Sequence, residues 1–540
     1  MAYQHVVSAS NGNNRATALV GMHSILVGFD FTGTKAQRNK LLGFAVHRTD
    51  LTANEAVWLC GQKRFKDQGD YGEDVPSSKA PFQTFHWSDY TAKPGHRYEY
   101  RVHSVFGTKQ QPELRDMTTL KVEAAKNTPG VAGVYFNRGV TAALAYRKRF
   151  GDVDPEDVID GSAFRWLSRG LLEGLADFIA SAQSGDELKV CIYEFEYEGA
   201  IDLLKAAKQR GVKLYITYHA KPGDKRTPLN TKHVNTLNLP ASRVKARTNV
   251  PNISHNKFVV HRSGGKPIKV WTGSTNWTDR GFYLQTNVGL VFNLTSVANA
   301  FDAFFDVLSD DPVTKEAKGA LATLTADVAS TLPQGWRMFF SPVAGDEQLR
   351  VAAKLIDEAD DAVFFSSPFG LDGAITAALN ANAGVTLEYG LVNVTNFKKL
   401  VARVDRSINS WITQPASLKK YDGRLWDAEA RGNHKIHVKS MVVDPWSDNP
   451  KVLIGSANFS DESVNKNDEN AFLIEGDGRL AAIVTTEFLR MFDHYKFRDW
   501  VRRAEVDTSE RFLAEDGAWT ADYYDSAKGK YRERMAFAQS

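Results

Sequence analysis

The feature that most constrains this chain is a phrase that occurs twice. One copy begins HNKFVVH at His255, and the other begins HVKSMVV at His437, 182 residues later. Each continues through a second apolar run to a Gly-Ser-x-Asn turn, GSTN in the first copy and GSAN in the second. The segments before the phrases also match: GAIDLLKAAKQRGVKLYITY starts at Gly199, and GAITAALNANAGVTLEYGLV starts at Gly373. A repeat this long is not a solenoid period, so it predicts a duplicated domain.

Each copy alternates a helical pattern with a short apolar run. Apolar residues at 3.6-residue spacing are followed by a glycine and then by a strand-like segment. This alternation indicates α/β units around a mostly parallel sheet, which gives each half an α/β/α fold. We expect the halves at 134–300 and 337–500, related by a pseudo-twofold axis, with a helical connector at 301–336 and the functional site between the halves.

Residues 1–126 differ in character and predict an all-β sandwich, because short apolar segments alternate there with polar turns. The stretch FHWSDYTAKPGHRYEYRVHSVFG from Phe85 resembles the W-x-D and P-G-x-x-Y-x-Y-x-V pattern of fibronectin type III domains. That resemblance implies a domain that docks a partner protein, and another kind of β-sandwich is the alternative. Residues 501–540 are expected to form a short helical tail.

Composition adds few constraints. The formal net charge of +3 over 540 residues predicts no particular partner, so any anion site must come from local clustering. Cys60 and Cys191 lie far apart and form neither a disulfide framework nor a metal-ligand spacing. No signal peptide and no apolar run of about 20 residues is evident. We therefore expect a soluble, cytoplasmic protein, with signal-independent export as an alternative.

The repeated phrase brings together side chains that carry chemistry. Residues i and i+2 of a strand point to the same face, so His255 and Lys257 share a face. The same holds for His437 and Lys439. The Gly-Ser-x-Asn turns add four more candidates: Ser274, Asn276, Ser456 and Asn458. Two halves face to face would therefore surround one pocket with paired imidazole, ammonium, amide and hydroxyl groups.

This set suits the cleavage of a phosphodiester. The lysines and amides can bind the non-bridging oxygens and the charge that develops in the transition state. One imidazole can attack phosphorus, and the other can protonate the leaving oxygen and then activate water. No carboxylate cluster suited to Mg²⁺ accompanies the motifs, so we expect chemistry without a metal or other cofactor.

At these residues the chain resembles the phospholipase D superfamily, whose H-x-K-x4-D motif is followed by G-S-x-N and occurs twice per site. The resemblance covers roughly 134–500 and implies a phosphodiesterase or phosphatidyltransferase that forms a phosphohistidine. The second copy keeps the motif's acid as Asp444, which we group with Ser274 and Ser456 as substrate-binding. The first copy has Arg262 there, at a strand end where the acid of the family is structural, so we do not infer inactivity.

A second acid distinguishes the two halves. Glu469 stands fourteen positions after the glycine of GSAN, and Asn287 stands at the matching place in the first copy. In the resembling family this acid orients a histidine, and the acid of one half can serve the histidine of the other. A carboxylate fixes the tautomer and supports an imidazolium. We therefore assign His255 as the nucleophile and His437 as the acid/base.

A basic stretch, 213–247, bears on the substrate, because it holds eight Lys and Arg residues against one acid. It could attract a polyanion or an anionic lipid surface, and a solvated loop is the alternative. We take Lys225 and Arg226 from it as substrate-binding and predict a nucleic acid, by similarity to the bacterial nuclease branch of the superfamily. His219 ends a strand, where it could touch substrate, and His434 is expected at a turn or pocket rim.

Two other functions stay open. A phospholipase D that acts on phosphatidylcholine-like lipids uses the same chemistry, and motifs do not define the leaving group. A catalytically impaired binding or scaffold protein is the other alternative, supported by Arg262 and Asn287.

Overall fold

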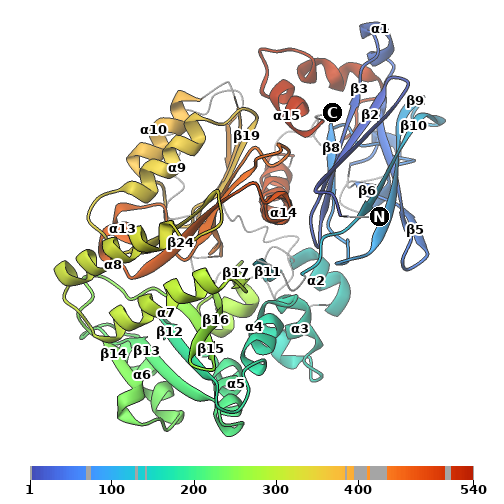
Figure 1. Cartoon of the computed structure of the whole chain (residues 1–540). Coiled ribbons are helices and arrows are strands. Elements are labelled where there is room, and N and C mark those ends of the chain that lie inside the picture. The colour runs from blue at the N-terminus through green and yellow to red at the C-terminus, as the bar shows by residue number, and fades with distance from the viewer. Residues whose placement is uncertain are drawn as a thin grey trace.

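The computed structural model describes residues 3–61, 63–68, 74–127, 132–139, 143–151, 153–382, 386–393, 410–413, 435–504 and 512–538. The chain forms an N-terminal β domain and two α/β halves, with the C-terminal segment returning to the N-terminal domain (Figure 1).

The N-terminal domain consists of two antiparallel four-stranded sheets around one apolar core. The sheets meet where Phe29 of one packs against Phe44 of the other, at 4.7 Å between ring centroids. The first sheet contains β1 (Val6–Asn11), β2 (Asn14–Val20), β3 (Ile25–Phe31) and β8 (His86–Asp89). The second contains β10 (Pro112–Glu123), β9 (Arg97–Gly107), β4 (Gly43–Asp50) and β5 (Glu55–Trp58). Helix α1 (Lys35–Arg38) and the short pair β6 (Cys60–Gly61) and β7 (Val75–Pro76) complete it. The fibronectin type III assignment stays a prediction.

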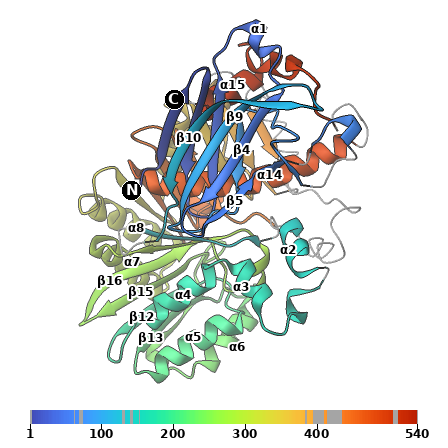
Figure 2. The ribbon, with the colours of Figure 1, turned by 90° about the vertical axis from the view of Figure 1, so that its right-hand side faces the viewer.

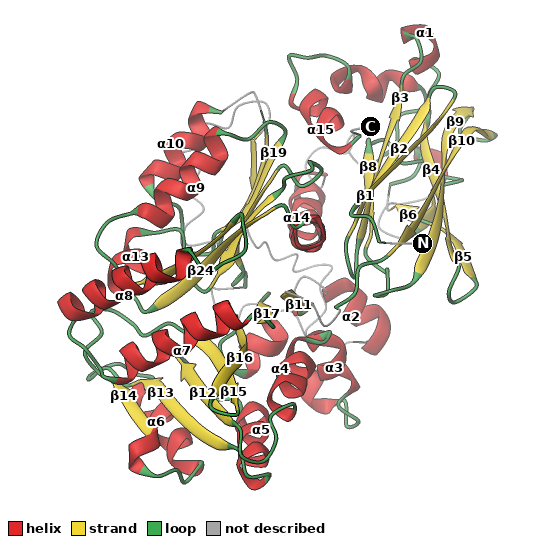
Figure 3. Ribbon diagram, in the orientation of Figure 1, coloured by secondary structure: helices red, strands yellow, loops and turns green. Residues whose placement is uncertain are grey.

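The first α/β half is built on a seven-stranded sheet with helices on both faces (Figure 3). Its strand order is β11 (Ala132–Phe136), β17 (Val288–Phe292), β16 (Lys266–Gly273), β15 (Lys257–Ser263), β12 (Glu187–Ile192), β13 (Lys213–His219) and β14 (Val244–Arg247). The helices are α2 (Ala143–Phe150), α3 (Ser162–Ser168), α4 (Leu171–Ala180), α5 (Glu198–Gln209), α6 (Thr227–Thr236) and α7 (Thr295–Ser309).

The second half repeats this strand order. Its sheet contains β18 (Trp336–Ser341), β24 (Glu469–Glu475), β23 (Lys451–Gly455), β22 (Lys439–Val443), β19 (Ala362–Ser366), β20 (Leu387–Leu391) and β21 (Ser410–Thr413). The helices are α8 (Thr314–Ala329), α9 (Glu347–Asp357), α10 (Gly373–Ala381), α13 (Asp461–Lys466) and α14 (Gly478–Ala504). Helices α9 and α10 cover one face of the sheet and α14 covers the other. The pseudo-twofold axis itself stays a prediction.

The prediction of a mostly parallel sheet is wrong. Only β12, β13 and β14 run parallel in the first half, as do β19, β20 and β21 in the second, and the other pairings are antiparallel. The strand after the first H-x-K returns through a two-residue hairpin at Gly264 and Gly265, with φ of +56° and +78°. Such a short connection can join only antiparallel strands.

One apolar cluster joins the two halves. It contains inward-facing residues of both seven-stranded sheets together with α7 and α14. Phe292 of the first sheet stacks on Phe472 of the second at 4.4 Å between centroids. Helix α7 begins at Thr295, before the predicted connector at 301–336, and α8 lies within that range. Because the sheets share a core, the edges that carry the repeated motifs are held at a fixed separation.

Helix α14 and the C-terminal segment connect the second half to the N-terminal domain (Figure 2). The segment contains a 3-10 helix, Gly517–Tyr523, and α15 (Gly529–Phe537). Helix α15 approaches β3 so closely that a Cβ on Gly28 would lie 1.8 Å from the carbonyl oxygen of Phe537. The aromatic residues Trp519 and Tyr523 pack on the N-terminal core. Within the described residues, no helix is both long and apolar enough to cross a membrane.

Phe537 tests this C-terminal docking. Its buried ring lies 4.1 Å from His86 of the N-terminal domain and 5.6 Å from Trp446 of the second half. Phe537→Ala should therefore lower the free energy of unfolding by about 3–5 kcal/mol. Met535→Ala, at a 47% exposed position on the same helix, should change it by less than about 0.5 kcal/mol. Equal effects of the two substitutions in denaturant titrations would contradict the docking.

Candidate active site

The two predicted histidines meet where the halves face each other. His255 lies just before β15 and His437 just before β22, and their ring centroids are 6.2 Å apart. Each residue is 4% exposed. The structure therefore brings the repeated motifs, 182 residues apart in the chain, into one buried site.

Backbone contacts between the halves hold each histidine in place. The His255 N–H donates to Asp468 O at 2.9 Å, and Asp468 N–H donates to Ile253 O. In the other direction, the His437 N–H donates to Thr286 O at 3.1 Å. Each histidine is thus fixed by the segment of the opposite half that precedes Glu469 or Asn287.

The side chains cross in the same way. His255 Nδ1 lies 2.8 Å from Glu469 Oε2, and His437 Nδ1 lies 2.8 Å from Asn287 Oδ1. A carboxylate only accepts, so His255 donates from Nδ1. Asn287 Nδ2 donates to Gly281 O, which leaves its Oδ1 to accept from His437. Both imidazoles therefore keep Nε2 as the nitrogen with the free lone pair.

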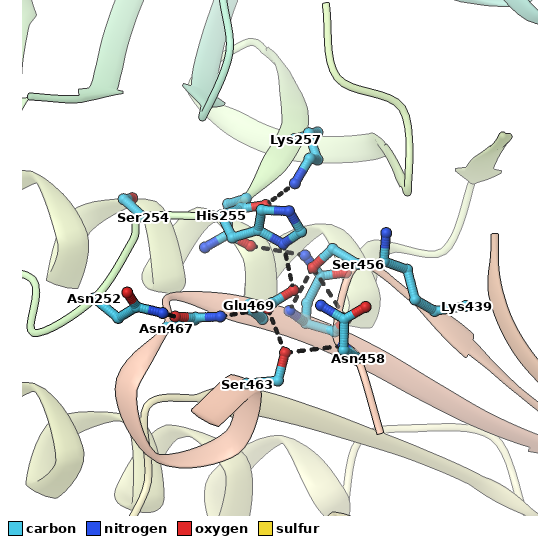
Figure 4. Close-up of polar contacts among 12 residues, drawn as sticks. Asn252, Ser254, His255, Lys257, Lys439, Ser456, Asn458, Ser463, Asn467 and Glu469 are labelled. Carbon is cyan, nitrogen blue, oxygen red and sulfur yellow. Dashed lines mark hydrogen bonds and ion pairs between the residues drawn. The ribbon is translucent and has the colours of Figure 1, made fainter. Parts of the chain in front are cut away.

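Glu469 is fixed by residues around it in the second half. It is fully buried, and its Oε1 accepts from Ser463 Oγ and from Asn467 Nδ2, the latter at 3.0 Å (Figure 4). Asn467 also accepts from Asn252 of the first half at 2.9 Å. This network leaves the second carboxylate oxygen aimed at His255.

Lys257 and Lys439 lie next to their histidines. Lys257 Nζ donates to His255 O, and Lys439 Nζ donates to His437 O at 2.8 Å. Both side chains are almost completely buried. The ammonium groups lie 5.1 Å and 5.5 Å from the ring centroids of Tyr193 and Phe369, respectively. The site thus holds two buried lysine amino groups close to two imidazoles.

Burial changes the charge of this site. It lowers the pKa of His255 and of His437 well below the usual histidine value, and the two lysines lower both further. It lowers the pKa of Lys257 to about 7 and that of Lys439 well below its usual range. The same effect raises the pKa of Glu469. The imidazoles are therefore neutral near pH 7, which leaves the Nε2 lone pairs available for attack.

In the Gly-Ser-x-Asn turns, the serines and the asparagines have different roles. Ser274 Oγ donates to Asn287 Oδ1 and accepts from Val288 N–H, while Ser456 Oγ accepts from Asn470 N–H. These bonds occupy the hydroxyls, so the prediction that the two serines bind substrate gives way to a structural role. Among the described residues, Asn276 Oδ1 and Asn458 Oδ1 are buried without a hydrogen-bond partner. Each amide oxygen can therefore accept a hydrogen bond from a ligand, whereas Nδ2 of Asn276 already donates to Glu194.

The assignment of Asp444 to substrate binding was wrong. Asp444 lies at the end of its strand away from Lys439, and its carboxylate accepts the N–H groups of residues 360–362 at 2.8–3.0 Å. In the first half, Arg262 occupies the matching position and pairs with Glu187 and Asp302. Both residues tie the strand end to its neighbour, which is why an arginine can replace the acid there.

The basic stretch is largely engaged in the fold. Arg226 pairs with Glu194 and Asp224, and its guanidinium lies 4.9 Å from the Tyr193 ring centroid, beside the site. Arg247 is fully buried against Asp468. Lys225 is exposed in the turn after β13. Lys225 and Arg226 thus follow the sheet edge where the site lies, but Arg226 already has acidic partners.

Several residues near the site were not predicted from the sequence. Glu194 accepts from Asn276 Nδ2, and Tyr193 lies 5.0 Å from His255 between ring centroids. At the position of the second half that matches Glu194, the chain has Phe369, 6.2 Å from His437 between centroids. The sequence could have indicated these residues, because each comes just after a strand of the parallel part of its sheet, where α/β sheets bind ligands.

His219 and His434 have different outcomes. His219 is fully buried behind His255, so it does not touch substrate. His434 lies outside the described residues. Within the described residues, no three His, Cys, Asp or Glu side chains are grouped as a metal site would require.

Comparison with known proteins identifies the family. The cardiolipin synthase, PLD-like domain family matches residues 175–308 and 353–492, one segment in each half. The two segments make up just over half of the chain, so the chain belongs to this family of PLD-like domain proteins. No curated protein matches the chain at a significant level.

Solved structures are similar at low identity. The chain is similar to polyphosphate kinase from Porphyromonas gingivalis at 16% identity and a TM-score of 0.38, over 58% of this chain and 46% of that one, so it spans about half of that protein. It is similar to phosphatidylserine synthase from Haemophilus influenzae at 13% identity and a TM-score of 0.45, over 64% of this chain and 94% of that one. It is similar to Nuc, a phospholipase D family member from Salmonella typhimurium, at 21% identity and a TM-score of 0.23, over 26% of this chain and 88% of that one.

The pKa of Lys257 leads to a pH prediction. A lysine with a pKa of about 7 is charged below that pH and loses its charge as the pH rises through it. Above about pH 7 the free site should bind a phosphate ester less well, so kcat/KM should fall by up to about tenfold per pH unit. In the complex the bound anion holds the proton on Lys257, so kcat should fall less. Profiles of kcat and KM between pH 5 and 9 check this, and a KM that stays constant to pH 9 would contradict it.

Proposed function

We propose that this chain is a phosphodiesterase that acts without a metal through a covalent phosphohistidine on His255. The observation that supports this most directly is the crossed arrangement at the site: two neutral imidazoles 6.2 Å apart, one held by Glu469 and the other by Asn287. A carboxylate stabilises the positive charge that a nucleophilic imidazole acquires. The Asn287 amide stabilises a positive charge on His437 less, which suits a histidine that exchanges protons with substrate.

In the first step, Nε2 of His255 attacks phosphorus and forms the P–N bond. The P–O bond to the leaving group breaks, and protonated His437 gives its proton to the departing oxygen. The phosphate anion raises the proton affinity of His437 when it binds, which offsets the effect of burial. Lys257 and Lys439 lie where they can neutralise the non-bridging oxygens.

In the second step, water attacks the phosphohistidine from the side of the departed group. His437, now neutral, takes the proton of the water as the P–N bond breaks. His255 leaves as an imidazole that again donates from Nδ1 to Glu469. The product is a phosphomonoester, and the site returns to its starting protonation state.

For the substrate we propose a nucleic acid. Lys225, Lys232 and Lys245 are exposed on the first half, and Lys225 follows the strand end that borders the site. Exposed cations near a diester pocket attract a polyanion, with an affinity that falls with salt. Arg226 and Arg247 pair with acids of the fold, so the basic stretch 213–247 supports nucleic-acid binding less than its full charge suggests.

A phospholipid is the second candidate, and one observation favours it. The charged Glu194 lies on the side of the first half, whereas the apolar Phe369 takes the matching place beside His437. A site with one charged and one apolar wall suits an amphiphile, in which the phosphodiester separates a polar group from an apolar one.

Finer assignments outside the site are proposals as well. We propose domains at 1–126, 134–300, 301–336, 337–500 and 501–540, a fibronectin type III-like N-terminal domain that docks a protein partner, and a cytoplasmic location. The scaffold alternative has less support, because both His-Lys pairs and both Asn side chains are assembled in one site.

The substrate test compares labelled single- and double-stranded DNA and RNA with phosphatidylcholine vesicles, all in excess EDTA. We expect turnover of one class in EDTA, and a loss of about 10³-fold or more in His255→Ala and in His437→Ala. His103→Ala, in the N-terminal sheet, serves as the matched control and should retain activity.

The outcomes separate the candidates. Cleavage of nucleic acid alone supports the nuclease proposal, and headgroup release alone assigns the lipid candidate. Activity that EDTA abolishes, or that survives both histidine substitutions, would overturn the mechanism. Inactivity of the wild-type protein on every substrate would favour the scaffold alternative.

A further inference from the structure

The residue before each of the two proposed catalytic histidines donates its backbone N–H to a buried side chain, and the type of that side chain differs between the halves. In the first half, the Ser254 N–H donates to Nδ1 of His219 at 3.2 Å. In the second half, the Ile436 N–H donates to Oδ1 of Asn393 at 3.1 Å. Ser254 and Ile436 are the residues directly before His255 and His437, so the two contacts occupy equivalent places in the site.

The strand registers support this equivalence. Glu187 pairs with Lys213 in the first sheet, and Ala362 pairs with Leu387 in the second. Six residues after Lys213 comes His219, and six residues after Leu387 comes Asn393. Both side chains are fully buried. Nδ1 of histidine and Oδ1 of asparagine are separated from Cα by the same number of bonds, so either residue can offer an acceptor at this place.

The bond from Ser254 determines the tautomer of His219. Nδ1 must carry the lone pair in order to accept a backbone N–H, so the proton resides on Nε2. Nε2 faces Asp224, whose Oδ2 lies 3.4 Å away, and Asp224 is itself fixed by accepting from Arg226 N–H at 2.8 Å. The other ionisable groups around the ring are Arg226, Lys221 and His255.

Tyr193 adds a second connection between the two rings. Its ring lies 5.2 Å from that of His219 and 5.0 Å from that of His255. His255 is therefore held at three points. Glu469 binds its imidazole, Asp468 O accepts its backbone N–H, and His219 accepts the N–H of Ser254, the residue before it.

We infer that His219, oriented by Asp224, is a positioning residue that sets the backbone in front of His255 so that its Nε2 points at phosphorus. Asn393 does the same for His437. This inference rests on the proposed phosphodiesterase function. Because His219 has no exposed surface, it acts through His255 and not on substrate. A displacement of a nucleophile by about 1 Å can cost about 100-fold in rate.

The test compares three variants of the full chain: His219→Asn, His219→Leu and His261→Leu. Asparagine restores the acceptor that the second half uses, and leucine removes it at similar size. His261 is the matched control, since it is also buried and contacts an acid, Asp186, at 2.9 Å, but it lies toward the far end of β15. Thermal unfolding of all three reports the general cost of changing a buried histidine.

The first readout is the division between kcat and KM. His219→Leu should lower kcat by about 100-fold with little change in KM. His219→Asn should restore kcat to within about threefold of wild type, and His261→Leu should match wild type at the same loss of unfolding temperature. Equal kcat values for the two leucine variants, or a folded His219→Asn protein as slow as His219→Leu, would overturn the inference.

The second readout does not need turnover. Hydrogen exchange, measured by mass spectrometry on overlapping peptides within 250–258, isolates the Ser254 N–H by difference. Exchange there should be about tenfold faster or more in His219→Leu and unchanged in the other two variants. If the wild-type protein turns over no substrate, the proposed function fails while this readout still decides the anchoring role. Unchanged exchange in His219→Leu would overturn that role.

Discussion

The site depends on the crossed contact between the halves, in which each histidine is held by the partner segment of the other sheet. Neither half contains a complete site, because Glu469 serves His255 and Asn287 serves His437. The ion pair between Arg247 and Asp468 supports this crossing, with both side chains fully buried. Removing one member of such a pair costs about 3–5 kcal/mol, since the other charge is left buried. The residue that makes this pair directly precedes Glu469, so the stability of the interface and the position of the acid are linked.

Duplication explains the architecture, and divergence between the copies explains the proposed division of labour. The halves share strand order and motif positions, but the chain has a carboxylate on one histidine and an amide on the other. The walls differ as well, with Glu194 on one side and Phe369 on the other. The supports of the backbone differ in the same way, with His219 in one half and Asn393 in the other. Two halves of the same strand order therefore hold a site whose two sides can do different chemistry and accept different parts of a substrate.

Local patterns in the sequence carried most of the catalytic prediction. The spacing of His255 and Lys257, the Gly-Ser-x-Asn turns and the matched positions of Glu469 and Asn287 all depend on short-range strand and turn geometry, which the chain encodes directly. The mixed direction of the sheets was missed because periodicity does not reveal strand direction. The roles of Asp444 and the two serines were missed because their hydrogen bonds go to backbone groups, and in Ser274 also to the Asn287 side chain, that only the packed sheet brings near. His219 is the clearest case: its partner, Ser254, is 35 residues away.

The most direct test of the central claim uses a diester whose leaving group needs no proton, bis(p-nitrophenyl) phosphate, with the His437→Ala protein. Without its acid/base, this variant should still attack phosphorus but should hydrolyse the adduct slowly. The account predicts a burst of about one nitrophenolate per site and a phosphoryl group that alkaline digestion and mass spectrometry locate on His255. An adduct on His437 in the His255→Ala protein, with none on His255 in the converse variant, would contradict it.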